Sequence, residues 1–240
     1  MVKIPLEILT NNKKITMKTF KNIFFDLGGV LFNIDLMGTL RRFRDLGMPI
    51  PADFLDGGTK TLAGLPKDSH PFFQMIHAMD LGRIRRDEFL QIMHTQCRPD
   101  VTDAEIIDAY CSMISVPASR LQLMQQLRKR YNVYLLSNIG DVHWDYVLRT
   151  TREMGYPMDE CFDHCFCSFQ LGVSKPDPAI FQRVIAESGV EPGESLYIDD
   201  FDDNIAAGLE AGLLAYKIDG NTLEQHVPAL FNLEPALFMQ

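Results

Sequence analysis

The segment from Lys21 to Leu31 reads KNIFFDLGGVL, and it decides the fold. An apolar run of β-favouring residues, Ile23 to Phe25, leads directly into a single carboxylate, Asp26, and a pair of glycines follows one residue later. This pattern predicts a buried β-strand that ends at Asp26 and then a sharp turn. Ligands of parallel α/β sheets bind beyond the carboxyl ends of the strands, so one interpretation is that Asp26 faces a ligand crevice. The other interpretation is that Asp26 merely begins a turn.

The composition describes an ordinary globular chain and excludes several functions. The 240 residues are 46% hydrophobic and 23% charged, which is enough for one core and an inserted module. No apolar stretch approaches the roughly 20 residues of a membrane helix, and the N-terminus lacks a secretion signal, so we expect a cytoplasmic protein without a membrane partner. The net charge of −9 argues against a nucleic-acid partner, and any phosphate site must be locally positive or assisted by a metal ion.

The five cysteines predict free thiols, because disulfides are rare in the cytosol. Three of them crowd around His164 in the segment CFDHCFC, at Cys161, Cys165 and Cys167. This spacing lacks the paired C-x2-C of structural zinc sites, and the segment alternates as a strand does. We therefore expect a strand here and no zinc.

The remaining pattern is a helical middle enclosed by ends that contain strands. Apolar spacing predicts helices over 36–47, 86–97 and 101–113, the last with a start that resembles a capping box, and no strong strand between 36 and 116. Beyond Pro117 the two types alternate, with helices over 118–130, 142–154, 177–188 and 203–211, and strands over 132–136, 163–167, 195–198 and 213–218.

Such alternation is typical of a parallel sheet. We therefore predict an α/β fold, in which a Rossmann-like, doubly wound core of about five strands carries an inserted all-helical cap. The expected boundaries are an N-terminal extension over 1–16, the core over 17–35 and 117–240, and the cap over 36–116. The apolar residues of the cap are expected to pack as its core: Phe43, Phe54, Phe72, Phe73, Met75 and Met79.

Polar residues follow three further strand ends. Ser137 and Asn138 offer a hydroxyl, an amide and backbone N–H groups to phosphoryl oxygens, although a helix cap would explain them equally well. Lys175 lies in the loop GVSKPDPAIF, whose prolines stiffen the chain and hold the ammonium. Asp199 and Asp200 are adjacent carboxylates that repel each other, and a hard cation such as Mg²⁺ is the simplest remedy.

Taken together and in this order, FFDLGGVLF, LLSN, GVSKPDPAIF and YIDDFDDN resemble the four motifs of the haloacid dehalogenase superfamily, over residues 18–217. The position of the helical insert, after the first motif, resembles that of members with a C1-type cap. Three stretches are similar to the bacterial α-D-glucose-1-phosphate phosphatase branch: the sequence DLGGVL, the S-N-x-x-x-x-H run through His143 and the L-G-x-x-K-P stretch. They are also similar to the N-terminal phosphatase domain of epoxide hydrolases.

This resemblance implies a Mg²⁺-dependent phosphomonoester hydrolase that acts on a small phosphorylated metabolite, such as a sugar 1-phosphate. Asp26 would attack the phosphorus and form a phosphoaspartyl intermediate, with Lys175 as the second catalytic residue. Lys175 would also bind the phosphoryl oxygens together with Ser137 and Asn138.

The same resemblance implies the ligands of the metal ion. Asp26, the backbone carbonyl of Gly28 and Asp200 would hold Mg²⁺, and Asp199 would either share that task or orient Lys175. The alternatives within the fold are a metal-independent 2-haloacid dehalogenase and a weakly active phosphate-binding protein. The pair of adjacent aspartates favours the phosphatase, since two carboxylates without a cation would repel a carboxylate substrate.

The chain departs from the superfamily pattern at Gly28. Most phosphatases of the superfamily carry there a second aspartate, which protonates the leaving group and later activates water. Loss of a general acid–base typically costs about 100- to 10,000-fold in rate, so we expect a preference for good leaving groups. His143 and Asp35 are candidate substitutes, but a helix cap for Asp35 and a partly buried surface position for His143 are the favoured interpretations. The oligomeric state is left open.

Overall fold

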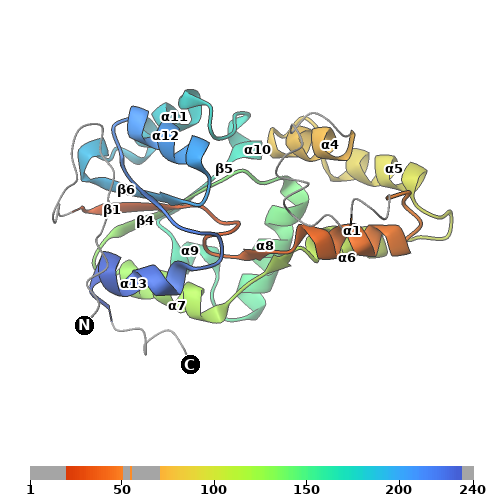
Figure 1. The fold of residues 1–240 in the computed structure, drawn as a ribbon, viewed down its shortest axis with the longest axis horizontal. Helices are drawn as coiled ribbons and strands as arrows, with labels where there is room; N and C mark the ends of the chain where they lie inside the picture. Colours follow the sequence, from red (N-terminus) through yellow and green to blue (C-terminus); the bar gives the residue numbers. More distant parts are fainter. Residues whose placement is uncertain (1–19, 51–54, 56–70, 234–240) are drawn as a thin grey trace.

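The computed structural model describes residues 20–50, 55 and 71–233, so the expected extension over 1–16 lies outside the described residues (Figure 1). Five parallel strands form the central sheet in the order β5-β4-β1-β6-β7. Their bounds are β1 Asn22–Phe25, β4 Asn132–Ser137, β5 His164–Cys167, β6 Ser195–Asp199 and β7 Leu214–Lys217. All five strands lie where the sequence predicts them, and the α/β core is confirmed.

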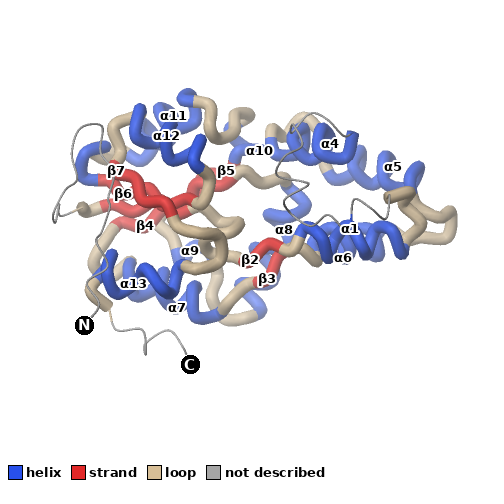
Figure 2. Tube along the Cα trace, viewed as in Figure 1, coloured by secondary structure: helices blue, strands red, loops and turns tan. Residues whose placement is uncertain are grey.

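Helices cover both faces of this sheet (Figure 2). In the view of the figure, α11 (Pro178–Ser188) and α12 (Asp202–Glu210) lie above it, and α7 (Ala118–Leu127) and α13 (Leu223–Phe231) lie below. The alternation of side chains along β1 divides the core accordingly. Phe24 packs in the cluster of α11 and α12, whereas Ile23 and Phe25 pack in the cluster of α7 and α13. Burial on both faces explains why the central strands β1, β4 and β6 each contain a continuous apolar run.

The predicted cap contains a hydrophobic cluster of its own. It is built from α1 (Leu36–Asp45), α4 (Pro71–Asp80), α5 (Arg86–Gln96) and α6 (Asp103–Cys111), and these helices extend away from the sheet in Figure 2. The expected apolar residues belong to this cluster: Phe43, Phe72, Met75 and Met79 are buried, Phe73 is partly buried, and Phe54 lies outside the described residues. Thr102 forms the expected capping box with Glu105.

Some elements differ from the sequence prediction. Ile114–Ser115 forms a two-residue strand, β3, inside the range expected to be free of strands, and it pairs antiparallel with β2 (Asn33–Ile34) where the chain enters and leaves the cap. The prediction omitted α4 and α13, as well as two short helices, α9 (Met158–Cys161) and α10 (Ser168–Leu171). The helix α8 (Asp141–Glu153) lies between the cap and the sheet (Figure 1).

The cysteine-rich segment forms strand β5, as expected. All five cysteines are free thiols, and burial raises the pKa of Cys165 to about 12, so this thiol is a poor metal ligand. Among the described residues, the group of side chains suited to hold a metal ion lies elsewhere, at the carboxyl ends of β1 and β6. None of the described helices has the length and apolar character needed to span a membrane.

Candidate active site

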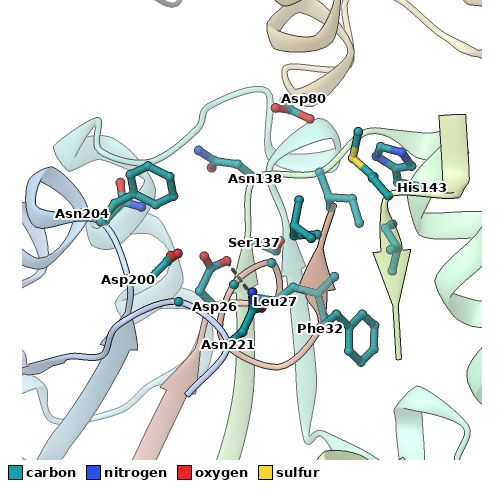
Figure 3. A pocket seen from close by; sticks show the side chains of 18 of the residues that line it. Asp26, Leu27, Phe32, Asp80, Ser137, Asn138, His143, Asp200, Asn204 and Asn221 are labelled. Atoms are coloured by element: carbon teal, nitrogen blue, oxygen red, sulfur yellow. Dashed lines mark hydrogen bonds between the residues drawn. The ribbon is translucent and has the colours of Figure 1, made fainter. Parts of the chain in front are cut away.

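Asp26 lies directly beyond β1 at the carboxyl edge of the sheet, where its backbone N–H donates to the carbonyl of Ile198 at 3.0 Å. Asp26 is 7% exposed as a residue, and it borders a cavity (Figure 3). The Oδ1 atom accepts from the backbone N–H of Leu27 at 2.7 Å and lies 2.8 Å from Nζ of Lys175. The Oδ2 atom has no hydrogen-bond partner among the described residues, so one oxygen of Asp26 is open to a ligand.

Lys175 is held between two carboxylates. Its side chain is buried, and Nζ lies 2.8 Å from Oδ1 of Asp26 and 2.8 Å from Oδ2 of Asp199. Burial alone would lower the pKa of Lys175, but the charges of Asp199 and Asp26 outweigh it, and the pKa is raised. Lys175 therefore carries a fixed positive charge at the carboxyl edge of the sheet.

Asp199 is fully buried and has both of its oxygens occupied. Besides Lys175, it accepts hydrogen bonds from the Tyr197 hydroxyl, the Asn204 amide and the backbone N–H of Phe201. The sequence left Asp199 as either a metal ligand or a residue that orients Lys175. Although one of its oxygens lies within 4.8 Å of one oxygen each of Asp26 and Asp200, this full set of partners favours the orienting role.

Asp200 has the opposite character. Its Oδ1 is a buried side-chain oxygen without a hydrogen-bond partner among the described residues, and burial together with the charge of Asp199 raises the pKa of Asp200 to about 6. A buried carboxylate oxygen without a donor costs free energy unless a cation or another ligand fills the place. With Asp26 close by, the residues present fit a hard divalent cation such as Mg²⁺, which binds through oxygen ligands.

The ionisation of Asp26 depends on the same surroundings. Burial raises its pKa to about 7, the charge of Lys175 opposes this effect, and the charge of Asp199 adds to it. A cation bound beside Asp26 would lower this pKa again by favouring the carboxylate.

Ser137, the last residue of β4, and Asn138, which follows it, have different environments. The side chain of Ser137 is buried at the cavity wall, and its hydroxyl has no hydrogen-bond partner among the described residues, so it is available to a phosphoryl oxygen. The amide of Asn138 instead clamps the loop of Lys175, because Oδ1 accepts from the Lys175 N–H at 2.8 Å and Nδ2 donates to the Lys175 carbonyl at 2.8 Å. Asn138 therefore positions Lys175, and only its remaining N–H is left for a substrate.

The glycine pair has a specific function in the turn. Gly29 has a φ of +76°, and a Cβ at this position would lie 2.3 Å from Oδ2 of Asp200. A glycine is therefore required here both for the backbone conformation and for the close approach of Asp200. A Cβ at Gly28 would meet the side chain of Ile34 at 3.2 Å, so Ile34 occupies the space beside the position where most phosphatases of the superfamily carry the second aspartate.

The cavity at this edge has a volume of about 430 Å³. Its polar groups gather at the strand ends, while much of the rest of its wall is apolar. The apolar side chains that line it are Leu27, Phe32, Ile34, Ile76, Met113, Ile114, Ile139 and Phe201. Asp80, at the end of α4, lies above the cavity opposite Asn138 (Figure 3). The described residues of the cap thus contribute both apolar surface and the carboxylate of Asp80 to this cavity.

Sequence reasoning missed Arg120, a buried residue at the start of α7. Its guanidinium donates to the carbonyl of Val30, to the side chain of Asn33 and to the carbonyl of Asn221, and it forms a bidentate ion pair with Glu224. Asn221 lines the cavity and donates its N–H to the carbonyl of Gly29. No local motif indicates these contacts, because the partners of Arg120 are about 90 to 100 residues away in the chain.

The two candidate substitutes for the missing aspartate have other roles. Asp35 caps α1 by accepting from the N–H of Gly38 at 2.8 Å, as favoured from the sequence. His143 is more buried than expected, with 8% exposure, and burial lowers its pKa to about 4. A histidine that stays neutral at physiological pH has no second proton to donate, so His143 is a poor general acid.

The fold and the site place the chain in a known class. A family model described as haloacid dehalogenase-like hydrolase matches residues 20–212, and the chain belongs to this family. The chain is 31% identical over 216 residues to D-ribitol-5-phosphate phosphatase of Bacteroides thetaiotaomicron, an alignment that covers 88% of this chain and 98% of the relative. The expectation of a hydrolase of this superfamily is confirmed.

Two further comparisons agree with this assignment. The solved structure of a HAD family enzyme from Bacteroides thetaiotaomicron, in complex with magnesium and inorganic phosphate, matches with a TM-score of 0.71 and 28% identity, covering 84% of this chain and 96% of that one. Bifunctional epoxide hydrolase 2 of Rattus norvegicus is 24% identical over 204 residues, which cover 79% of this chain and 35% of the relative. The similarity to epoxide hydrolases expected from the motifs is thereby confirmed.

Proposed function

We propose that this chain is a Mg²⁺-dependent phosphomonoester hydrolase in which Asp26 is the nucleophile. The observation that carries the proposal is the carboxyl edge of the sheet. There Asp26 has one open oxygen beside the fixed ammonium of Lys175, and the partnerless Oδ1 of Asp200 lies close by. This arrangement suits a dianionic phosphoryl group better than a monoanionic haloacid, because a cation and an ammonium together match its charge.

The reaction proceeds in two displacements on phosphorus. A carboxylate oxygen of Asp26 attacks the phosphorus, and the bond from phosphorus to the leaving oxygen breaks. The leaving oxygen takes its proton from water, since Gly28 supplies no acid. A water molecule then attacks the phosphoaspartyl group and loses a proton to solvent, the bond between Asp26 and phosphorus breaks, and inorganic phosphate is released.

The other residues hold the phosphoryl group during both steps. The ammonium of Lys175 and the hydroxyl of Ser137 bind its equatorial oxygens, while Asp199 and Asn138 fix the position of Lys175. Asp26, the carbonyl of Gly28 and Asp200 are the residues that would hold Mg²⁺. When bound, this ion supplies positive charge that offsets the charge of the phosphoryl oxygens.

The substrate is proposed to be a small phosphorylated metabolite. The missing acid at Gly28 favours a good leaving group such as the anomeric oxygen of a sugar 1-phosphate. The name of the relative from Bacteroides thetaiotaomicron points instead to a primary alcohol phosphate, D-ribitol 5-phosphate. A comparison of kcat/KM for glucose 1-phosphate and D-ribitol 5-phosphate separates these two classes.

The proposal is tested by hydrolysis of p-nitrophenyl phosphate with Mg²⁺ present. We expect Asp26→Asn to lower kcat by about 10,000-fold or more, since removal of a nucleophile abolishes the covalent route. The matched control is Asp203→Asn, an exposed aspartate in the first turn of α12, and it should keep the activity of the native chain.

Two other outcomes would reject the phosphatase. Release of halide from 2-chloropropionate that survives a chelator would identify a dehalogenase. Binding of inorganic phosphate without any turnover dependent on Asp26, at any pH, would identify a binding protein.

A further inference from the structure

His143 is fixed at the base of the cap in one orientation. It lies in the first turn of α8, and its ring stacks on the ring of Tyr110 from α6, with the centroids 3.8 Å apart and the planes at 10°. Its Nε2 atom is 3.1 Å from the backbone carbonyl of Tyr110. The stacking and the hydrogen bond together prevent the ring from turning.

These contacts decide which ring nitrogen carries the proton. A carbonyl oxygen only accepts hydrogen bonds, so Nε2 of His143 must be the donor. Burial keeps the ring neutral, as its lowered pKa indicates, so the second nitrogen, Nδ1, has a lone pair. Among the described residues, Nδ1 has no hydrogen-bond partner. A buried imidazole thus carries one open acceptor.

The imidazole that carries this acceptor lines the cavity of the active site. His143 lines the cavity on the side away from Asp200 and Asn204 (Figure 3). The wall of this cavity also contains Met113, Ile114 and Ile139, whose side chains have no donor that could satisfy Nδ1. The phosphoryl group is proposed to bind beside Asp26 and Asp200, so His143 is placed to meet the leaving group instead.

We propose that Nδ1 of His143 accepts a hydrogen bond from a hydroxyl of the leaving group, so that the site selects hydroxylated phosphomonoesters over apolar ones of equal length. This inference rests on the proposed phosphatase function. An apolar leaving group would strip water from Nδ1 and leave a buried acceptor unpaired, whereas a hydroxyl at the right distance replaces that water.

The test uses two series of alkyl phosphates with three to six carbons, one ending in a methyl group and the other in a hydroxyl. For the native chain with Mg²⁺, we expect kcat/KM to favour the hydroxylated member by about 10- to 100-fold at one chain length. His143→Phe keeps the stacking on Tyr110 but removes the acceptor, and it should abolish this preference. Met113→Leu, a substitution of similar volume in the same wall, should leave the preference in place.

Two results would overturn the inference. One is the same ratio of the two kcat/KM values in the native chain and in His143→Phe. The other is a ratio near one at every chain length in the native chain. If p-nitrophenyl phosphate is not hydrolysed at all, the proposed function fails, which is a different outcome from an active enzyme without the preference.

A second measurement does not depend on activity or on the folding of a His143 variant. In Asp26→Asn labelled with ¹⁵N-histidine, long-range ¹H–¹⁵N spectra should identify Nε2 of His143 as protonated and Nδ1 as unprotonated. With Mg²⁺ present, the hydroxyalkyl phosphate of the preferred length should shift the Nδ1 resonance, and the alkyl phosphate of equal length should not. A proton on Nδ1, or equal shifts with both compounds, would contradict the inference.

Discussion

Asp200 can lie where it does only because Gly29 has no β-carbon. Gly29 has a positive φ, and the carboxylate of Asp200 fills the space where a Cβ would lie, at 2.3 Å. We expect Gly29→Ala to displace Asp200, to lower the affinity for Mg²⁺ by at least about tenfold, and to destabilise the fold by more than about 1 kcal/mol. Mg²⁺ titration and chemical denaturation of the variant check these effects.

Gly155→Ala is the matched control for this prediction. Gly155 has a similar φ of +82°, but a Cβ there would have nothing within 4 Å. This variant should lose stability through backbone strain and keep its affinity for Mg²⁺. An equal loss of affinity in both variants would show that strain, and not contact with Asp200, is the cause.

A second prediction at the residue scale concerns how His143 makes the stability of the fold depend on pH. Its pKa is about 4 in the folded chain and 6.5 when unperturbed, so between these values the unfolded chain binds more protons. The free energy of unfolding therefore falls as the pH falls from 6.5 to 4, by at most about 3 kcal/mol from this residue. Denaturation curves should show the stability difference between the native chain and His143→Phe shrinking over this range. A constant difference would contradict a buried neutral imidazole.

At the scale of elements, Arg120 connects four parts of the chain. From α7 it reaches the turn after β1, strand β2, the loop at Asn221 and helix α13. Arg120→Met should destabilise the fold by about 3 kcal/mol, since it leaves two carbonyls and Glu224 without their donor. Thermal denaturation measures this loss. Glu224→Gln keeps a hydrogen-bond acceptor and should cost less. Equal losses of stability in the two variants would mean that Arg120 stabilises the fold only through its charge pairing with Glu224.

The elements predicted best are those whose burial follows a simple period. Each strand of the sheet is covered on both faces, and each predicted helix begins or ends near a local signal such as the capping box at Thr102. Helix α4 was not predicted, although its buried residues Phe72, Met75 and Met79 lie at helical spacing. The pairing of β2 with β3 joins residues about 80 positions apart, which no local pattern indicates.

At the scale of the whole molecule, the order of the motifs predicted which residues meet at the edge of the sheet. It brought Asp26, Ser137, Lys175 and Asp200 together correctly, because parallel strands place their carboxyl ends on one side. What it could not predict is how each group is used. That the amide of Asn138 clamps Lys175, and that the oxygens of Asp199 are all occupied, depends on distances that only the folded chain fixes.

At the same edge of the sheet, we expect bound Mg²⁺ to stabilise the whole molecule. Asp26, Asp199 and Asp200 place three carboxylates within 4.8 Å of one another, with Lys175 as the cation between two of them. A ligand that binds only the folded chain stabilises it by about 2.7 kcal/mol at 100 times its dissociation constant. We therefore expect Mg²⁺ to raise the midpoint of thermal unfolding, and a chelator to reverse the effect.

Asp200→Asn separates this cause from a general effect of salt. It removes one negative charge and a carboxylate oxygen that lacks any partner, so the variant should be more stable than the native chain in the chelator. It should also gain little from Mg²⁺, because an amide is a weaker ligand than a carboxylate. Asp203→Asn, on the exposed start of α12, should respond to Mg²⁺ as the native chain does. If all three proteins were stabilised equally, the ion would be acting on the surface and not at Asp200.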